Sequence, residues 1–274
     1  MTKESYRGRI APSPTGYLHL GHAMTFWQAQ ERVRAADGKL ILRIEDIDRS
    51  RCRSEFSDAL IEDLHWFNLS WEEGPDVDGC FGPYVQSARR RYYLAALQEL
   101  RAGRFIYPCV CSRKDVFNAA TAPHDENEEP IYPGTCRHGR NSSAMVHWRF
   151  RVADGEQLSF LDERLGMQTA IAGRDFGDFI VWRRDDVPAY QLAVVVDDAA
   201  MKITEVVRGE DLLLSTFRQL LLYRALGLKP PKFFHAPLVL DKDGKRLAKR
   251  DRPMSLRALR ASGVSPDEIR RHMM

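Results

Sequence analysis

Hydrophobic and polar positions follow two different periods along the first hundred residues, and each period predicts one type of element. A short β-type run over 7–11 enters a turn rich in proline and glycine, and a helical pattern follows over 22–36. A second apolar run over 39–44 predicts another strand, so the chain opens as a β-α-β unit. Helical patterns begin next at Ser54 and at Ser87, and Gly103 ends the second of them.

Beyond Phe105 this regular alternation is interrupted. Short β-type runs over 145–152 and 179–183 fall in a block that we interpret as an insertion, so the sheet closes late in the chain. Alternation resumes afterwards with a strand predicted over 201–207, a helix over 215–226 and a strand over 234–240. Two short helices are predicted to begin at Ser255 and at Ser265. The sequence therefore predicts an α/β fold, divided into 1–108 (first half of the main domain), 109–185 (insertion), 186–240 (second half of the main domain) and 241–274 (loop and short helical end).

The composition is that of an ordinary globular protein. The chain of 274 residues carries 41 basic and 38 acidic residues, and a net charge of +3 says little about partners. The charge is unevenly placed, with an acidic group over 125–129 and a basic stretch over 242–271. The N-terminus has no apolar signal core and no apolar stretch approaches the length of a membrane span, so we expect a cytoplasmic protein without a membrane partner.

Three of the five cysteines are close together in sequence and predict a metal site rather than a disulfide. Cys109 and Cys111 are followed by Tyr132 and Cys136, which gives four donor groups in a compact span. Thiolates select zinc, and four ligands suit a structural site. His138 competes with Tyr132 as the fourth ligand, and donor chemistry alone favours the imidazole.

The most distinctive motif is His19-Leu20-Gly21-His22, which stands where the first strand and turn lead into a helix. Such a junction aims backbone N–H groups and the positive end of the helix at an anion. Gly21 leaves room for a nucleotide against the backbone, and His19 and His22 offer N–H donors to phosphate oxygens. A cationic segment far downstream, Lys245-Arg-Leu-Ala-Lys-Arg250, complements this motif, and together they predict an ATP site.

These two motifs, with 43–46, Tyr190, 194–198 and 208–211, resemble the catalytic domain of the class I glutamyl-tRNA synthetases over most of the chain. The resemblance implies a Rossmann-type parallel sheet with an inserted zinc subdomain, in which the histidine motif and the Lys/Arg loop flank ATP. One position departs from the family pattern, because Ala248 stands where a serine is usual. Lys249 is retained, so we expect ATP use to survive.

The reaction implied by the resemblance is attack of the glutamate α-carboxylate on the α-phosphorus of ATP, which gives glutamyl adenylate and pyrophosphate. His19, His22 and Lys249 would serve as catalytic groups, with Mg²⁺ brought by ATP. The same two histidines, Gly21 and Lys249 would bind ATP. Arg9 and Arg208 would pair with carboxylates, while Glu45 would accept the α-ammonium. The full set of implied glutamate-binding positions is Arg9, Ile10, Ala11, Pro12, Ser13, Glu45, Tyr190 and Arg208, with Asp197 and Asp198 as possible supporting groups.

Chain length and the cysteine region refine the resemblance. The chain stops soon after the Lys/Arg loop, and the segment from Tyr132 to Cys136 resembles the zinc site of short family members that act on queuosine. Those members activate glutamate without tRNA and transfer it to queuosine at the wobble position of tRNA(Asp). We accordingly expect Tyr132 as the fourth zinc ligand, no anticodon-binding domain, and a monomer. The anticodon stem-loop would meet basic residues of the tail, namely Arg250, Arg252, Arg257 and Arg260.

Two other functions stay open from the sequence. One is a catalytic fragment of a glutamyl-tRNA synthetase that charges the 3′ end of tRNA. The other is a non-catalytic paralogue that binds RNA through the zinc insertion and the basic tail, with Ala248 as an early sign of decay.

Overall fold

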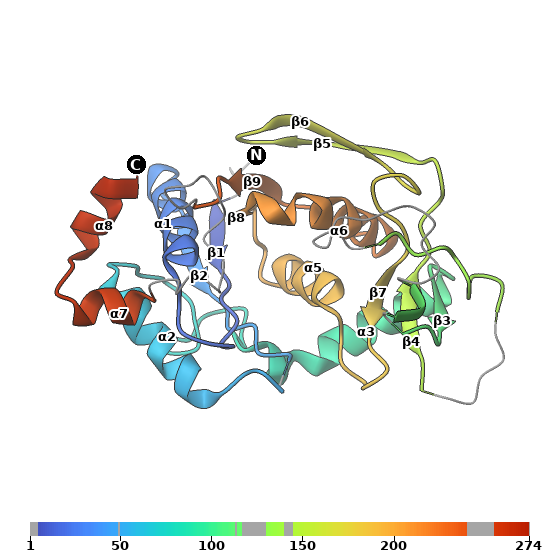
Figure 1. Ribbon diagram of the computed structural model, residues 1–274, viewed down its shortest axis with the longest axis horizontal. Helices are drawn as coiled ribbons and strands as arrows, with labels where there is room; N and C mark the ends of the chain where they lie inside the picture. The colour runs from blue at the N-terminus through green and yellow to red at the C-terminus, as the bar shows by residue number, and fades with distance from the viewer. Residues whose placement is uncertain are drawn as a thin grey trace.

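The computed structural model describes residues 5–48, 50–112, 114–116, 130–139, 145–239 and 255–273, with side chains up to residue 271. Figure 1 shows an elongated molecule. The first strands and their helices occupy one end, beside the C-terminal helices. A small sheet lies at the opposite end, and two helices of the second half lie between these parts.

The predicted β-α-β opening is confirmed. Strand β1 (Arg7–Ile10) pairs in parallel with β2 (Lys39–Leu42), and helix α1 (Leu20–Ala35) connects them. The segments that follow the two strands stay paired, because the Glu45 amide donates a hydrogen bond to the Pro12 carbonyl over 2.9 Å. This pairing places the residues that follow β1 beside those that follow β2, at the carboxyl ends of two parallel strands. Helix α2 (Ser54–Trp66) follows as predicted.

A second parallel pair comes from the later half of the chain. Strands β8 (Glu205–Gly209) and β9 (Lys232–Ala236) are joined by the short helix η2 (Glu210–Leu212) and by α6 (Leu213–Ala225). The Thr204 amide donates to the Arg7 carbonyl over 2.9 Å, so β8 lies beside β1. The prediction of a strand over 201–207 is wrong in its first part, because Met201 ends a helix by donating to the Asp197 carbonyl over 2.8 Å.

A helix, a hairpin and the strand β3 (Ile106–Cys109) were not predicted. Helix α5 (Tyr190–Ala200) was missed because its residues 192–198 are all buried, so no polar face marks a helical period. The hairpin of β5 (Gln157–Asp162) and β6 (Gly166–Ile171) was missed because these strands contain few of the β-branched and aromatic residues that favour strands. It runs along one edge of the molecule toward β9 in Figure 1.

The hairpin corrects the prediction of a purely parallel sheet. Strand β5 forms a parallel bridge to β9 between Asp162 and Phe233, and β6 pairs with β5 in antiparallel fashion. The structure therefore has mixed sheets, and part of the predicted insertion over 109–185 extends the sheet of the second half. The domain boundaries themselves stay a prediction.

The remaining elements complete the two ends of the molecule. The helix predicted from Ser87 starts as a 3₁₀ turn, and the short sheet pairs β3 with β4 and β4 with β7, all antiparallel. Ser255 caps the first C-terminal helix by accepting from the Ala258 amide. Their bounds are η1 (Gln86–Arg89), α3 (Arg90–Ala102), β3 (Ile106–Cys109), β4 (His147–Phe150), β7 (Phe179–Trp182), α7 (Leu256–Ala261) and α8 (Pro266–Met273).

Two large apolar cores hold these parts together, and a smaller buried cluster surrounds Cys109, Cys111 and Cys136. One lies among β1, β2, α1, α2 and α7, and the other joins α3, α5 and α6 to the small sheet. Within the described residues, none of the helices combines the length and apolar character needed to span a bilayer.

Candidate functional site

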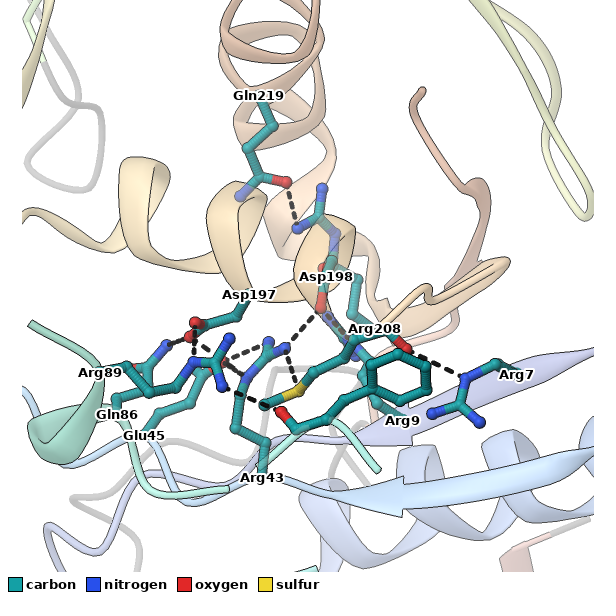
Figure 2. Close-up of polar contacts among 12 residues, drawn as sticks. Arg7, Arg9, Arg43, Glu45, Gln86, Arg89, Asp197, Asp198, Arg208 and Gln219 are labelled. Atoms are coloured by element: carbon teal, nitrogen blue, oxygen red, sulfur yellow. Dashed lines mark hydrogen bonds and ion pairs between the residues drawn. The ribbon is translucent and has the colours of Figure 1, made fainter. Parts of the chain in front are cut away.

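A buried arginine lies at the centre of the site. Arg43, just after β2, is fully buried, and its guanidinium donates to Asp198 over 2.6 Å and to Glu45 over 2.9 Å. Figure 2 shows Arg43 between these carboxylates, with side chains converging from β1, β8, α5 and α6. An ion pair buried this completely fixes the positions of its members, since moving either one would leave an unpaired charge.

The consecutive acids of α5 have a larger part than the sequence suggested. Asp197 accepts from Arg89 over 2.5 Å and from Tyr93 over 2.9 Å, while Asp198 binds Arg43. Burial raises the pKa of Asp197, and it likewise raises the pKa of Glu45. The signal for this role was two carboxylates at the end of a wholly apolar run, where only buried partners can stabilise them.

Arg9 and Arg208 reach the same place from neighbouring strands. Arg9 is 5% exposed, donates to the Val207 carbonyl over 3.0 Å, and lies 3.6 Å from Asp198. Arg208 is 4% exposed, and its described hydrogen bonds go to neutral acceptors: Gln219 at 2.8 Å, Thr216 at 2.6 Å and His235 at 3.3 Å. No ion pair among the described residues involves Arg208, and burial lowers its pKa.

Tyr190 opens α5 beside these charges. It is 39% exposed, and its hydroxyl interacts with Arg208. Desolvation raises its pKa, and Arg208, Glu45 and Arg9 all act on it electrostatically. The structure thus brings together four residues of the predicted glutamate site: Arg9, Glu45, Tyr190 and Arg208.

The other predicted glutamate positions form the segment after β1. The side chain of Ile10 is fully buried in the core, so only its backbone can face a ligand. Pro12 contributes its carbonyl to the pairing with Glu45. Ala11 is half-buried and Ser13 is exposed. Among these, Ser13 has the side chain best placed to meet a ligand from solvent.

The histidine motif forms the start of α1. His19 is the N-cap residue, its side chain forms no capping hydrogen bond to the first turn, and this turn contains no acidic residue. The amides of the first turn and the helix dipole make this end electropositive. The rings of His19 and His22 lie 6.3 Å apart, with His22 exposed. A side chain added at Gly21 would lie 3.9 Å from Val239, so the segment that follows β9 passes beside this turn.

Lys249 lies outside the described residues, as do Ala248, Arg250 and Arg252. The described residues on both sides of that segment lie at the histidine turn. Val239 contacts the turn at Gly21, and Ser255 forms an antiparallel bridge with His19. The Leu256 amide also donates to the Leu18 carbonyl over 2.8 Å. The chain therefore leaves and re-enters the described structure beside the predicted ATP site.

The cysteine cluster is buried at the far end of the molecule. Cys109, Cys111 and Cys136 have sulfur atoms within 4.8 Å of one another, and the Sγ atoms of Cys111 and Cys136 are 3.7 Å apart. Tetrahedral zinc with bonds of about 2.3 Å to sulfur separates two sulfurs by roughly 3.8 Å. The spacing of these thiols therefore fits zinc.

Tyr132, rather than His138, lies at the cluster. Its hydroxyl is 3.4 Å from the Sγ atoms of both Cys109 and Cys111, and it accepts from the Cys136 amide over 3.0 Å. His138 is exposed. The fourth donor suggested by the short family members is thus the one that faces the three thiols.

The basic tail has fewer available charges than its sequence suggested. Arg257 pairs with Glu62 over 2.8 Å, and Arg270 is buried against the Phe67 carbonyl and the Trp27 ring. Arg260 is exposed. Part of the basic character of this tail therefore holds α7 and α8 against the body.

The chain matches the catalytic domain of the class I tRNA synthetases (E and Q) over residues 5–274. It is 48% identical to a glutamyl-Q tRNA(Asp) synthetase of Symbiobacterium thermophilum, covering 97% of this chain and 84% of that protein. Identity to the glutamyl-Q tRNA(Asp) synthetase of Nitratidesulfovibrio vulgaris is 46%, with 96% and 83% covered.

The fold is similar to that of a glutamate tRNA ligase from Elizabethkingia meningosepticum, solved in complex with its amino acid. The TM-score is 0.79 at 29% identity, with 90% of this chain covered. The chain spans about half of that longer protein, 52% of its length. The match over 5–274 and the identities above show that the chain belongs to the class I glutamyl- and glutaminyl-tRNA synthetase family, among the glutamyl-Q tRNA(Asp) synthetases.

Proposed function

We propose that this protein activates L-glutamate with ATP in the absence of tRNA and transfers it to queuosine at the wobble position of tRNA(Asp). Within this family, the observation that carries the proposal is the buried guanidinium of Arg208, whose hydrogen-bond acceptors among the described residues are all neutral. A buried positive charge with no carboxylate in direct contact is costly, so an anionic substrate that supplies one binds strongly.

Glutamate suits the charges that surround Arg208. Arg9 and Arg208 offer donors to carboxylates, and guanidinium groups bind carboxylates with two parallel hydrogen bonds. Glu45 gives one oxygen to Arg43, and no described hydrogen bond engages its Oε2. That oxygen is available to the α-ammonium group. Because Glu45 and Arg43 hold each other in place, the site is organised before the substrate arrives.

Adenylate formation requires alignment more than activation, because a carboxylate is already a nucleophile. The start of α1, which has no acidic residue in its first turn, provides backbone amides for the triphosphate, and His19 and His22 add N–H donors. Mg²⁺ bound to ATP supplies further positive charge at the phosphates. The protein's contribution is to hold the two reactants in line and to stabilise the charge that develops.

Lys249 completes this site in the proposal. It is six residues from Ser255, which bridges to His19, and six extended residues span at most about 20 Å. With Val239 beside Gly21 at the other end, the segment is anchored at the turn on both sides. The lysine charge is therefore within reach of phosphates bound at the start of α1.

A structural zinc ion held by Cys109, Cys111, Tyr132 and Cys136 is the second component. The donor set consists of three soft thiolates and one phenolate oxygen, all buried, and four ligands suit a structural zinc site. When bound, zinc would hold the loop after β3 to the segment that contains Cys136. It has no part in the chemistry, since the cluster lies at the end of the molecule opposite the histidine turn.

For the RNA we propose the anticodon stem-loop of tRNA(Asp), bound by a protein monomer. The exposed Arg260 provides positive charge on α7, close to the histidine turn, whereas the neighbouring Arg257 is paired with Glu62. Contacts of this kind bind phosphates without reading the sequence, and they weaken as salt increases. The modified base would supply the specificity.

Exchange of labelled pyrophosphate into ATP tests the activation step. The proposal predicts exchange that depends on L-glutamate, proceeds without tRNA, and is much weaker with L-glutamine or L-aspartate. Folded protein that gives no exchange would favour a non-catalytic RNA-binding protein. Exchange only in the presence of tRNA would instead favour a fragment of a glutamyl-tRNA synthetase.

A further inference from the structure

A buried aspartate–histidine pair lies directly behind Arg208. Asp162 ends β5 and His235 lies in β9, and both are at most 1% exposed. His235 Nδ1 is 2.7 Å from Asp162 Oδ2, while its Nε2 is 3.3 Å from the Nε of Arg208. The pair thus connects the hairpin of the insertion to a residue of the proposed glutamate site.

The surroundings of Asp162 decide where the imidazole proton lies. Its Oδ1 accepts from the amides of Arg164 at 3.0 Å and Leu165 at 2.8 Å, and its Oδ2 accepts from the His235 amide at 3.1 Å. Burial acts to raise the pKa of Asp162, but these hydrogen bonds and His235 hold it below its usual value. An ionised carboxylate only accepts, so the proton is on His235 Nδ1.

With Nδ1 protonated, the other ring nitrogen of His235 is an acceptor. It receives the Nε–H of Arg208, and the Thr216 hydroxyl lies 3.0 Å away. Burial, followed by the charge of Arg208, lowers the pKa of His235 to about 4, so the ring is neutral near pH 7. Arg208 therefore gains an acceptor that fixes its plane without gaining a negative charge.

Neighbouring buried arginines are held in a different way. Arg7 donates directly to Glu73 over 2.8 Å, and Arg43 donates directly to Asp198. At Arg208 the nearest carboxylate along the hydrogen-bonded chain is Asp162, and an imidazole separates the two. A carboxylate in direct contact would neutralise Arg208 and repel an anionic ligand.

We propose that Asp162 and His235 are positioning and specificity-determining residues, which hold Arg208 through one fixed histidine tautomer and keep its charge available to a substrate carboxylate. This inference rests on the proposed function, because it takes glutamate as the substrate. His235 separates the two groups. It transmits the orientation fixed by Asp162 to Arg208, but it keeps the negative charge of Asp162 out of direct contact with Arg208.

The substitution Asp162→Asn tests the tautomer. The asparagine amide can donate a hydrogen bond to Nδ1 of His235, so the ring proton moves to Nε2. There it faces the Nε–H of Arg208, and two donors cannot form a hydrogen bond with each other. We expect the KM for glutamate in pyrophosphate exchange to rise about tenfold or more, with smaller changes in the KM for ATP and in kcat.

The substitution His235→Gln provides the rescue. Its side-chain oxygen can accept from Arg208 whatever group stands at position 162. In this background, adding Asp162→Asn should change the KM for glutamate by less than about threefold. The matched control is Asp178→Asn, a buried carboxylate of the small sheet that also accepts from a backbone amide, at Val152. It should lower the melting temperature and leave the KM for glutamate unchanged.

The tautomer can be read without any substrate. Proton–nitrogen NMR of protein labelled in its histidines, with His235 assigned by its loss in His235→Gln, should show the proton on Nδ1. The Asp162→Asn protein should show it on Nε2. A wild-type ring protonated on Nε2 would overturn the inference even if the proposed function holds. An Asp162→Asn effect that is equal in both backgrounds, or that follows the melting temperature as the control does, would also overturn it.

Discussion

Replacing Arg43 with methionine tests whether the buried charges organise the site. Arg43 is fully buried and lies 2.6 Å from Asp198 and 2.9 Å from Glu45, so the change leaves these carboxylates without their main partner. Breaking a buried ion pair by removing one partner costs about 3–5 kcal/mol. At about 2–4 °C per kcal/mol for a chain of this size, the melting temperature should fall by roughly 6–20 °C.

The loss should also depend on pH in a definite direction. Burial already raises the pKa of Glu45 and Asp197, and without Arg43 these values rise further. An acid whose pKa is higher in the folded than in the unfolded state binds its proton more tightly when folded. Above the folded-state pKa it is ionised and destabilises the fold, and this cost decreases as the pH falls below that value. The difference between wild type and Arg43→Met should therefore be smaller at pH 5 than at pH 7.5.

Calorimetric melting at the two pH values measures both effects. The control is Arg224→Met. Arg224 forms an ion pair of similar length with Glu156, 2.5 Å, but its side chain is 61% exposed. Exposed pairs contribute at most about 1 kcal/mol. The reasoning is refuted if Arg43→Met costs no more than this control, or if its cost is the same at both pH values.

Three further changes test other parts of the site. Lys249→Ala should lower glutamate-dependent pyrophosphate exchange about a hundredfold or more, while glutamate binding, measured by calorimetry, stays nearly unchanged. Equal losses of exchange and of glutamate binding would mean that the loop has a structural role. Cys136→Ser should reduce zinc per chain, measured by emission spectrometry, and lower the melting temperature, whereas Cys80→Ser, at an exposed free cysteine, should change neither. Arg208→Gln should raise the KM for glutamate by on the order of a hundredfold, and a change below threefold would remove Arg208 from the pocket.

Local signals in the sequence were sufficient for the elements that have one buried face or a clear terminal residue. The strand, turn and helix around the histidine motif were predicted closely, because an apolar run, a Pro/Gly turn and a helical period follow one another without ambiguity. The cysteine cluster was also predicted, since its residues lie within a short stretch of chain. Tyr132 was chosen through family resemblance, against donor chemistry alone.

Features that depend on long-range packing were not visible in the sequence. Helix α5 is buried on all sides along residues 192–198, so its pattern lacks a polar face. The pairing of Asp162 with His235 joins residues 73 positions apart and becomes apparent only when β5 lies beside β9. The same holds for Arg89 and Asp197, whose ion pair depends on how α3 packs against α5.

The most direct test of the central claim is transfer of labelled glutamate to tRNA(Asp) with and without queuosine, followed by nuclease mapping of the label. The account predicts glutamate on the queuosine-containing RNA alone, in the fragment that holds the anticodon loop. Equal labelling of both RNAs, or label on the 3′-terminal adenosine, would contradict it.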